Sequence, residues 1–168
     1  MKIIAYIEND FTEKFGIPRQ SGLSPIVSRI VFKKEYRVKE AFRGLSGYSH
    51  LWLIWKFSKA ERTDWSPTVR PPRLGGNTRM GVFATRSPFR PNNLGLSSVK
   101  IVAIEESAAD GVVIHVQGAD LMNNTPIYDI KPYVAYSDAH PQARSGFVDE
   151  NRWQCLAVNI PQEYERLF

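Results

Sequence analysis

The sequence predicts a mainly β domain, either a barrel or a sandwich, with short helices and long loops rich in glycine and proline. Two observations support this class: short apolar or alternating segments recur along the chain, and Gly/Pro turns separate them with almost no long helical period. A third is that the strand–helix–strand rhythm of a doubly wound sheet is missing. If a nucleotide cofactor binds, it therefore binds a different architecture.

The first half of the chain is expected to supply three strands and one short helix. The strands are expected at 3–8, 26–32 and 49–57, and the helix at 39–45. A loop at 11–24 separates the first two strands, because it contains Gly16, Pro18 and Gly22 and has no period. The segment 49–57 is the strongest strand, and both of its alternating faces are largely apolar. We expect one face to line the core and the other to be covered by another part of the chain.

The second half is expected to contain further short strands joined by shaped loops. The strands are expected at 81–85, 96–105, 112–117, 127–134 and 152–158, and a helix is expected to begin at Pro161. The second and third of these would form a hairpin through the turn Ala109-Asp110-Gly111. Prolines and glycines exclude a helix or a central strand at 67–77 and make 86–94 a shaped loop.

Length and composition suit one domain with its own core, because 43% of the 168 residues are hydrophobic. Cys155 is the sole cysteine, so neither an internal disulfide nor a cysteine-based metal cluster can form within one chain. The three scattered histidines do not make a metal site. No apolar run is long enough to cross a bilayer, and the first residues lack the features of a signal peptide. We therefore expect a cytoplasmic protein that binds no metal.

The positive charge of the chain is concentrated in residues 65–99. The sequence contains 22 basic and 17 acidic residues, and this segment holds five arginines but no Asp, Glu or Lys. Without these five residues, the basic and acidic counts would both be 17. The excess therefore indicates an anionic partner such as phosphate, carboxylate or nucleic acid. The five residues are Arg70, Arg73, Arg79, Arg86 and Arg90.

Prolines and glycines in the same segment indicate a receptor of fixed shape rather than a loose basic loop. Prolines set the backbone before a ligand binds, and glycines let a ligand approach it closely. The glycine spacing matches neither of the common phosphate-binding loops. From the residues alone, Arg86-Ser-Pro-Phe-Arg-Pro-Asn92 is a preorganised binding site that only weakly indicates an enzyme.

Three segments of this chain have a distinctive order of residues: Trp65-Ser-Pro-Thr-Val-Arg-Pro-Pro-Arg-Leu-Gly-Gly-Asn77, Met80-Gly-Val-Phe-Ala-Thr-Arg-Ser-Pro-Phe-Arg-Pro-Asn92 and Thr125-Pro-Ile-Tyr-Asp-Ile-Lys-Pro-Tyr133. These segments resemble the TrmO family of tRNA methyltransferases. Shorter matches are Lys14-Phe-Gly-Ile-Pro-Arg-Gln20, Phe42-Arg-Gly-Leu45 and Ser49-His-Leu-Trp52. The family often has Asp-Gly where this chain has Asn123-Asn124. Asparagine tolerates left-handed backbone geometry, so we expect the turn to be kept.

The resemblance implies a single-sheet β-barrel, a homodimer and S-adenosyl-L-methionine as cofactor. It also implies methylation of N6 of threonylcarbamoyl-adenosine at position 37 of tRNA. The barrel domain is expected at 1–140, and 141–168 is expected to hold a final strand and the start of a helix. Fuller family members carry a further C-terminal domain, so this chain is either a short member or a truncated one.

The family's cofactor contacts carry over to several short segments of this chain. The residues are Pro18, Arg19, Gln20, His50, Leu51, Arg86, Leu96, Asp120, Leu121, Met122 and Asn123. The chemistry of these residues is compatible, because Arg19 or Arg86 suits the carboxylate of the cofactor and Asp120 suits its ribose diol. A strand edge near Leu121 could supply backbone donors for the adenine.

The resemblance leaves the tRNA contacts and the proton acceptor more open. Candidates for contact with tRNA are Arg70, Arg73, Arg79, Phe89 and Arg90, although the arginines could equally shape the loop. Asp129 or Tyr128 could help to deprotonate N6, and a structural ion pair between Asp129 and Lys131 is at least as compatible with the sequence. The alternative function is a non-enzymatic RNA-binding or nucleotide-sensing β-barrel, which would share the arginine surface but not the cofactor.

Overall fold

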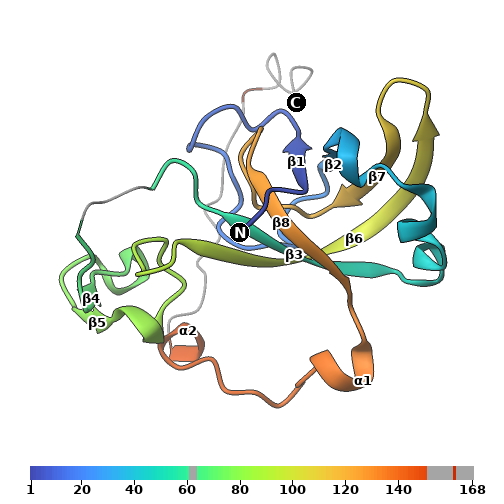
Figure 1. Cartoon of the computed structure of the whole chain (residues 1–168). Helices are drawn as coiled ribbons and strands as arrows, with labels where there is room; N and C mark the ends of the chain where they lie inside the picture. The colour runs from blue at the N-terminus through green and yellow to red at the C-terminus, as the bar shows by residue number, and fades with distance from the viewer. Residues whose placement is uncertain (61–63, 151–160, 162–168) are drawn as a thin grey trace.

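The structure is a computed structural model that describes residues 1–60, 64–150 and 161, and its centre is a closed antiparallel barrel (Figure 1). The strand order around the barrel is β1-β2-β7-β6-β3-β8, and β8 pairs with β1 through Ile127 opposite Ala5. The strands are β1 (Ala5–Glu8), β2 (Val27–Phe32), β3 (His50–Lys56), β6 (Leu94–Ser107), β7 (Gly111–Gln117) and β8 (Pro126–Pro132). Closure removes the sheet edges, and it decides between the barrel and the sandwich.

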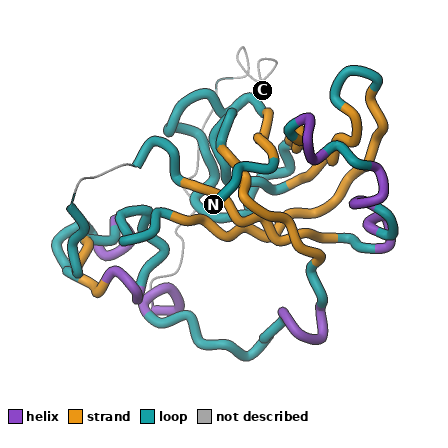
Figure 2. The backbone as a smooth tube through the Cα atoms, viewed as in Figure 1, coloured by secondary structure: helices purple, strands orange, loops and turns teal. Residues whose placement is uncertain are grey.

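A two-stranded sheet and several single helical turns complete the described chain (Figure 2). The small sheet pairs β4 (Thr68–Val69) with β5 (Met80–Gly81). The 3-10 turns are η1 (Lys34–Tyr36), η2 (Lys39–Phe42), η3 (Leu45–Gly47), η4 (Pro72–Leu74) and η5 (Val82–Ala84). The one-turn α-helices are α1 (Ala135–Asp138) and α2 (Phe147–Glu150). In 1–60 and 64–150, no helix has the length and apolar character needed to cross a membrane.

The predicted mainly β class is confirmed, and the six barrel strands lie where the apolar patterns placed them, with ends shifted by one or two residues. The short helix expected at 39–45 is present as the 3-10 turns η2 and η3. The segment 67–77 contains no central strand, only the two residues of β4 and the single turn η4. The strand expected at 152–158, Cys155 included, and the helix expected after Pro161 lie outside the described residues.

The strand expected at 81–85 is wrong beyond Gly81. There the chain bends into η5, and the hydroxyl of Thr85 donates a hydrogen bond to the carbonyl of Val82 at 2.9 Å. The backbone N–H of Val82 donates to the carbonyl of Pro67 at 2.9 Å, which draws the turn toward the preceding loop. A hydroxyl that closes a local turn competes with strand pairing, and here the turn prevails.

The barrel interior is the hydrophobic core, and β3 shows how its alternation builds this core. Leu51, Leu53 and Trp55 point inward and are at most 4% exposed. Burial of a large apolar side chain stabilises a fold by about 1.5–3 kcal/mol. The core residues from the other segments are Ala5, Ile7, Ile30, Phe32, Val99, Ile114, Val116, Ala119, Leu121 and Ile127.

The outer face of β3 is covered at Trp52 by the chain that follows β8. The indole Nε1 of Trp52 donates a hydrogen bond to Asp138 Oδ2 at 2.8 Å, and the ring of Tyr133 lies 5.5 Å from the indole. The backbone N–H of Val134 donates to the same oxygen at 2.9 Å. These donors, Val134 first and Trp52 second, hold the pKa of Asp138 below its ordinary value. The cover predicted for the second apolar face of this strand is therefore present at Trp52.

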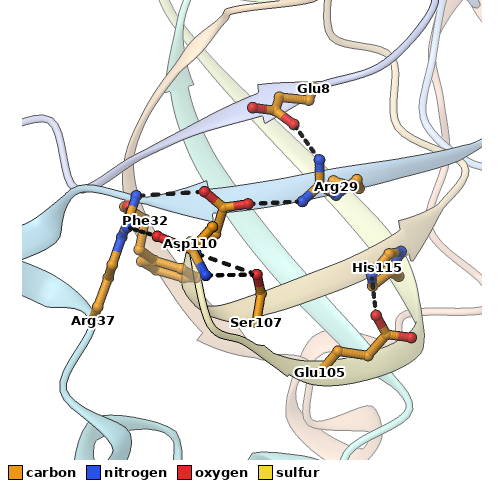
Figure 3. Close-up of polar contacts among 9 residues, drawn as sticks. Glu8, Arg29, Phe32, Arg37, Glu105, Ser107, Asp110 and His115 are labelled. Atoms are coloured by element: carbon orange, nitrogen blue, oxygen red, sulfur yellow. Dashed lines mark hydrogen bonds and ion pairs between the residues drawn. The ribbon is translucent and has the colours of Figure 1, made fainter.

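Charged side chains tie β1, β2 and the β6–β7 turn together on the outside of the barrel (Figure 3). Arg29 pairs with Glu8 at 2.7 Å and with Asp110 at 3.1 Å. Arg37 lies 4.0 Å from Asp110 and donates a hydrogen bond to the carbonyl of Phe32 at 2.8 Å. One exposed ion pair contributes little to stability, but a shared carboxylate between two arginines fixes the position of the turn. The predicted turn at 109–111 is confirmed between β6 and β7.

Candidate functional site

Three segments that are far apart in the sequence meet at the end of the barrel where β6 begins and β3 and β7 end. They carry Gln20, Arg86 and Asp120. Nη1 of Arg86 donates a hydrogen bond to Oε1 of Gln20 at 2.5 Å. The carboxylate of Asp120 faces the charge of Arg86 and accepts a hydrogen bond from the backbone N–H of Ser21. An arginine, a carboxamide and a carboxylate are therefore available to one ligand.

Two glycines hold the loop of Gln20 against the barrel. The N–H of Gly22 donates to the carbonyl of Gly118 at 2.8 Å, and both residues have positive φ, 81° and 85°. A Cβ on Gly118 would lie 3.1 Å from backbone atoms of Gly22. Glycine alone combines this backbone conformation with so close an approach at no steric cost. The contact places the residues just before Gly22 beside Asp120.

A buried serine holds Asp120. Ser97 lies on β6, is 1% exposed and donates its hydroxyl to Asp120 Oδ1 at 2.5 Å. Burial raises the pKa of Asp120 above its ordinary value, whereas the hydrogen bond from Ser97, those from backbone N–H groups and the charge of Arg86 oppose the rise. Hydrogen bonds to a carboxylate are stronger in such a partly dry setting than on an open surface. Ribose hydroxyls are suitable donors to it.

The loop that carries Arg86 is stiffened from within by Arg90. Nη1 of Arg90 donates to the carbonyl of Thr85 at 2.7 Å and to that of Val82 at 3.1 Å. Its guanidinium also lies 5.6 Å from the centre of the Phe83 ring. The structure thus favours the loop-shaping role for Arg90, while the neighbouring Arg86 reaches out to Gln20.

A cleft of about 1430 Å³ is lined by Gln20 and Arg86 together with residues of β4 and α2. The ribbon of the small β4–β5 sheet runs close to α2 (Figure 1). Four of the five arginines of the basic segment line this cleft, as does Phe89. Two further arginines join them from outside that segment. The cationic lining consists of Arg19, Arg70, Arg73, Arg79, Arg86 and Arg144.

Two residues assigned to the cofactor by resemblance lie elsewhere within the single chain. His50 begins β3, whereas Trp55, which contacts Ser97, lies five residues further, about 16 Å along the strand. The ring of His50 lies 6.1 Å from that of Tyr133, and its Nδ1 lies 2.9 Å from the hydroxyl of Ser49. Leu51 is wholly buried in the core. One chain therefore does not bring these two residues to Arg86.

Leu96 lies on the outer face of the barrel. It is 59% exposed and pairs with Ile54 across the β3–β6 ladder. Because side chains alternate along a strand, it points away from the inward-facing Ser97. Leu96 is therefore available to a ligand or partner on the outside of the sheet.

The segment after Asp120 is a turn that is fixed by its own hydrogen bonds. The side chain of Leu121 is fully buried, and its carbonyl accepts a hydrogen bond from Asn9 Nδ2 at 3.0 Å. Oδ1 of Asn123 accepts the backbone N–H of Asn9 at 3.1 Å, and the carbonyl of Met122 closes the turn. Asn124 has a φ of 61°, which confirms the left-handed geometry expected at this pair of asparagines.

The candidate proton acceptors lie on β8 beside a bulge. Ile54 of β3 faces Asp129, but the next pair is Trp55 with Ile127, so Tyr128 is the extra residue. Oδ2 of Asp129 lies 3.1 Å from Nζ of Lys131, and both side chains are substantially exposed. The ion pair left open by the sequence is thus present, on the same outer face as Leu96.

Sequence reasoning missed two residues of this region. Ser97 occupies an inward position of β6 between Gly95 and Val99. A serine at an inward position that is otherwise apolar indicates a specific polar contact, so the alternation along this strand could have identified it. Arg144 lines the cleft from a segment beyond the matched motifs, and only the folded chain brings it there.

Comparison with known proteins identifies relatives over most of this chain. Residues 6–139 match the family of the tRNA-methyltransferase O N-terminal domain. A tRNA (adenine(37)-N6)-methyltransferase from Escherichia coli is 40% identical over 164 residues, which cover 97% of this chain and 69% of that protein. A Pseudomonas aeruginosa protein, whose name describes an S-adenosylmethionine-dependent methyltransferase, is 42% identical over 147 residues, covering 87% of this chain and 59% of the relative.

The fold of the chain is also similar to that of solved structures. The crystal structure of TrmO from Pseudomonas aeruginosa superposes with a TM-score of 0.71 at 38% identity and covers 88% of this chain. The match spans 61% of that structure's chain. The chain therefore spans about three fifths to two thirds of the length of these relatives.

Proposed function

Because the chain belongs to the family of tRNA-methyltransferase O N-terminal domains, we propose that it uses S-adenosyl-L-methionine to methylate N6 of the adenosine at position 37 of tRNA. The proposed substrate is the adenosine that already carries a threonylcarbamoyl group. The observation that carries the proposal is the meeting of Gln20, Arg86 and Asp120 at the head of an arginine-lined cleft. The arginine and the carboxamide suit the carboxylate end of the cofactor, and the carboxylate of Asp120 suits its ribose end.

The residues present fit S-adenosyl-L-methionine. In this proposal, Arg86 and Arg19, which line the same cleft, bind the carboxylate of the cofactor, and Asp120 accepts hydrogen bonds from its ribose hydroxyls. The bound cofactor supplies an activated methyl group on a positively charged sulfur. The protein contributes orientation, because methyl transfer requires the accepting nitrogen to approach in line, and positioning of this kind supplies much of the rate.

The wider part of the cleft is proposed to receive the tRNA. Arg70, Arg73 and Arg79 supply cations for phosphates, and Phe89 supplies a ring on which a base can stack. Arg144 lines the same cleft and is proposed to join this set. Arg90 is placed in the loop framework instead, because its guanidinium is engaged by the carbonyls of Val82 and Thr85.

A homodimer is proposed from the outer face of β3, β6 and β8. His50 and Ile54 on β3 share this face with Leu96 on β6 and Asp129 on β8. The exposed side chain of Leu96, next to Ile54, is a hydrophobic contact site on this face. If a second copy binds to this face, His50, Leu96, Tyr128 and Asp129 of one subunit would face the cofactor that is bound by the other subunit. Within one chain, these residues do not reach the cofactor site. We further propose that residues 1–140 form the methyltransferase domain and that the protein acts in the cytoplasm.

The experiment that tests this function compares cofactor binding with methyl transfer. Calorimetry with S-adenosyl-L-methionine separates an enzyme from the alternative, a non-enzymatic RNA-binding barrel, which would produce no heat. Labelled cofactor is then incubated with tRNA that carries threonylcarbamoyl-adenosine and with the same tRNA lacking that group. Label is expected in the modified nucleoside only. Cofactor binding without transfer of label to either tRNA would refute the substrate assignment.

A further inference from the structure

We infer that Ser97 and Trp55 are positioning residues that aim the carboxylate of Asp120 at the ligand, and that Gly95 provides the space they require. The inference rests on the proposed role of Asp120 in cofactor binding. The three residues lie on the two neighbouring strands β3 and β6, next to the end of the barrel where Asp120 lies. The Pro18–Gln20, Arg86 and Asp120 contacts expected from the family resemblance do not include them.

The indole of Trp55 determines the direction of the hydrogen bonds from Trp55 to Ser97 and from Ser97 to Asp120. Nε1 of Trp55 lies 2.9 Å from Oγ of Ser97, and that oxygen lies 2.5 Å from Oδ1 of Asp120. An indole N–H can only donate, so the serine oxygen must accept from it. The single hydroxyl hydrogen of Ser97 is then directed to Asp120. Trp55 therefore selects one of the rotamers that the hydroxyl could adopt and orients it toward the carboxylate.

Gly95 allows the indole to reach Ser97. It is the cross-strand partner of Trp55, and a Cβ at position 95 would lie 2.2 Å from Cε2 of the indole and 2.4 Å from Cζ2. Any side chain there would displace the ring. Phe57 also packs against the indole, with ring centroids 4.2 Å apart and ring planes inclined by 55°. Gly95 and Phe57 together restrict the orientation of the indole whose N–H reaches the serine.

The hydrogen bond from Ser97 favours the charged form of the Asp120 carboxyl group, although this group is largely buried. Four groups face this carboxyl: the Ser97 hydroxyl from β6, the N–H groups of Ser21 and of Asp120 itself, and the Arg86 guanidinium. Burial raises the pKa of Asp120, and the bond from Ser97 is the largest contribution that lowers it. A carboxylate accepts from ribose hydroxyls more strongly than the neutral acid does. Removal of the Ser97 hydroxyl should therefore weaken the ligand contact without touching the ligand.

The test uses the full chain with Ser97→Ala, Ser97→Thr and Trp55→Phe. Carbon-detected NMR measures the pKa of Asp120 in the ligand-free protein, and calorimetry measures the affinity for S-adenosyl-L-methionine across the acid to neutral range. Ser97→Ala is expected to raise the pKa of Asp120 and to weaken binding by roughly tenfold or more, with a larger loss at lower pH. Trp55→Phe keeps a ring but removes the donor, and it is expected to give a smaller change in the same direction. Ser97→Thr keeps the hydroxyl and is expected to restore both quantities.

The matched control is Ser46→Ala, which removes an exposed serine hydroxyl on the turn η3, away from the proposed site and dimer face. It is expected to leave the Asp120 pKa and the affinity unchanged. The inference is overturned if Ser97→Ala and Trp55→Phe both leave the Asp120 pKa at its wild-type value. Failure of the wild-type protein to bind S-adenosyl-L-methionine would instead refute the proposed function, and the NMR titration of the free protein would still decide the role of Ser97 and Trp55.

Discussion

At the scale of single residues, Asp120 places ligand binding and stability in opposition. Its pKa is raised mainly by burial, so the folded protein holds the carboxyl proton more tightly than the unfolded chain does. The unfolded state then binds fewer protons between the two pKa values, and the free energy of unfolding falls as pH rises through that interval. At neutral pH, the free protein therefore carries a charge whose burial lowers its stability.

Asp120→Asn is accordingly expected to separate the two properties. The neutral amide removes the buried charge, so the melting temperature of the ligand-free protein at neutral pH should equal or exceed that of the wild type. Affinity for S-adenosyl-L-methionine should fall by roughly tenfold or more, because the charged acceptor is lost. Thermal unfolding in the absence and presence of the cofactor measures both effects. A variant that is clearly less stable and binds normally would contradict this account of the site.

At the scale of elements, the loop from η5 to Arg90 behaves as a structural unit that presents Arg86. Arg90→Ala removes two charge-assisted hydrogen bonds to backbone carbonyls, and we expect it to reduce the free energy of unfolding by about 1–3 kcal/mol. Urea denaturation measures the loss. Cofactor affinity should also decline, because the loop that holds Arg86 is no longer stiff.

Arg79→Ala is the matched control for this loop, since Arg79 is an exposed arginine of the same segment. Its removal should leave the urea midpoint within experimental error of the wild type and weaken binding of tRNA. Equal stability losses for the two variants would show that Arg90 is not a structural residue of the loop.

The elements that could be predicted from the sequence are strands in which apolar residues recur at every second position. In β3, inward Leu51 and Leu53 alternate with partly exposed residues, and this pattern alone located the strand. The segment after Gly81 carries the same kinds of residue, yet it forms η5 because the hydroxyl of Thr85 and the carbonyl of Pro67 complete a local turn. That outcome depends on a contact with a distant loop, which periodicity does not contain. The barrel closure through β1 and β8 is likewise a long-range pairing, implied by resemblance rather than by pattern.

At the scale of the whole molecule, the site is an assembly of loops that the barrel brings together. Charge counting located the arginine-lined cleft, and matched motifs named Gln20, Arg86 and Asp120. The fold joins Gln20 to Arg86 by a hydrogen bond and brings Asp120 within the influence of the Arg86 charge. Neither approach identified Ser97, because its role depends on a hydrogen bond to Asp120 that forms only in the folded chain. The motifs also named His50, which one chain leaves at the opposite end of β3. Sequence motifs record which residues are used, but they do not record whether one subunit or two supply them.

The distribution of charge over the molecule is uneven in a way that bears on tRNA binding. Some cations around the barrel have acidic partners, as in the pair of Arg29 on β2 with Glu8 on β1 and the pair of Lys39 on η2 with Glu106 on β6 (Figure 3 shows the first pair). The segment that lines the cleft contains arginines and no acidic residue. Phosphates should therefore be attracted to one side of the protein, and this attraction should be sensitive to salt.

Replacing Arg70, Arg73 and Arg79 together with alanine is expected to reduce this salt sensitivity. Each phosphate contact releases counterions, so the slope of log K against log salt concentration should become shallower by about 1 for every arginine that contacts a phosphate. Binding of tRNA, measured by fluorescence anisotropy over a salt series, supplies the slope, and calorimetry with S-adenosyl-L-methionine shows whether the cofactor end of the cleft is intact. Lys34→Ala, on the exposed turn η1 and outside the cleft lining, is the matched control and should leave the slope unchanged. An unaltered slope in the triple variant would place the tRNA on another face of the protein.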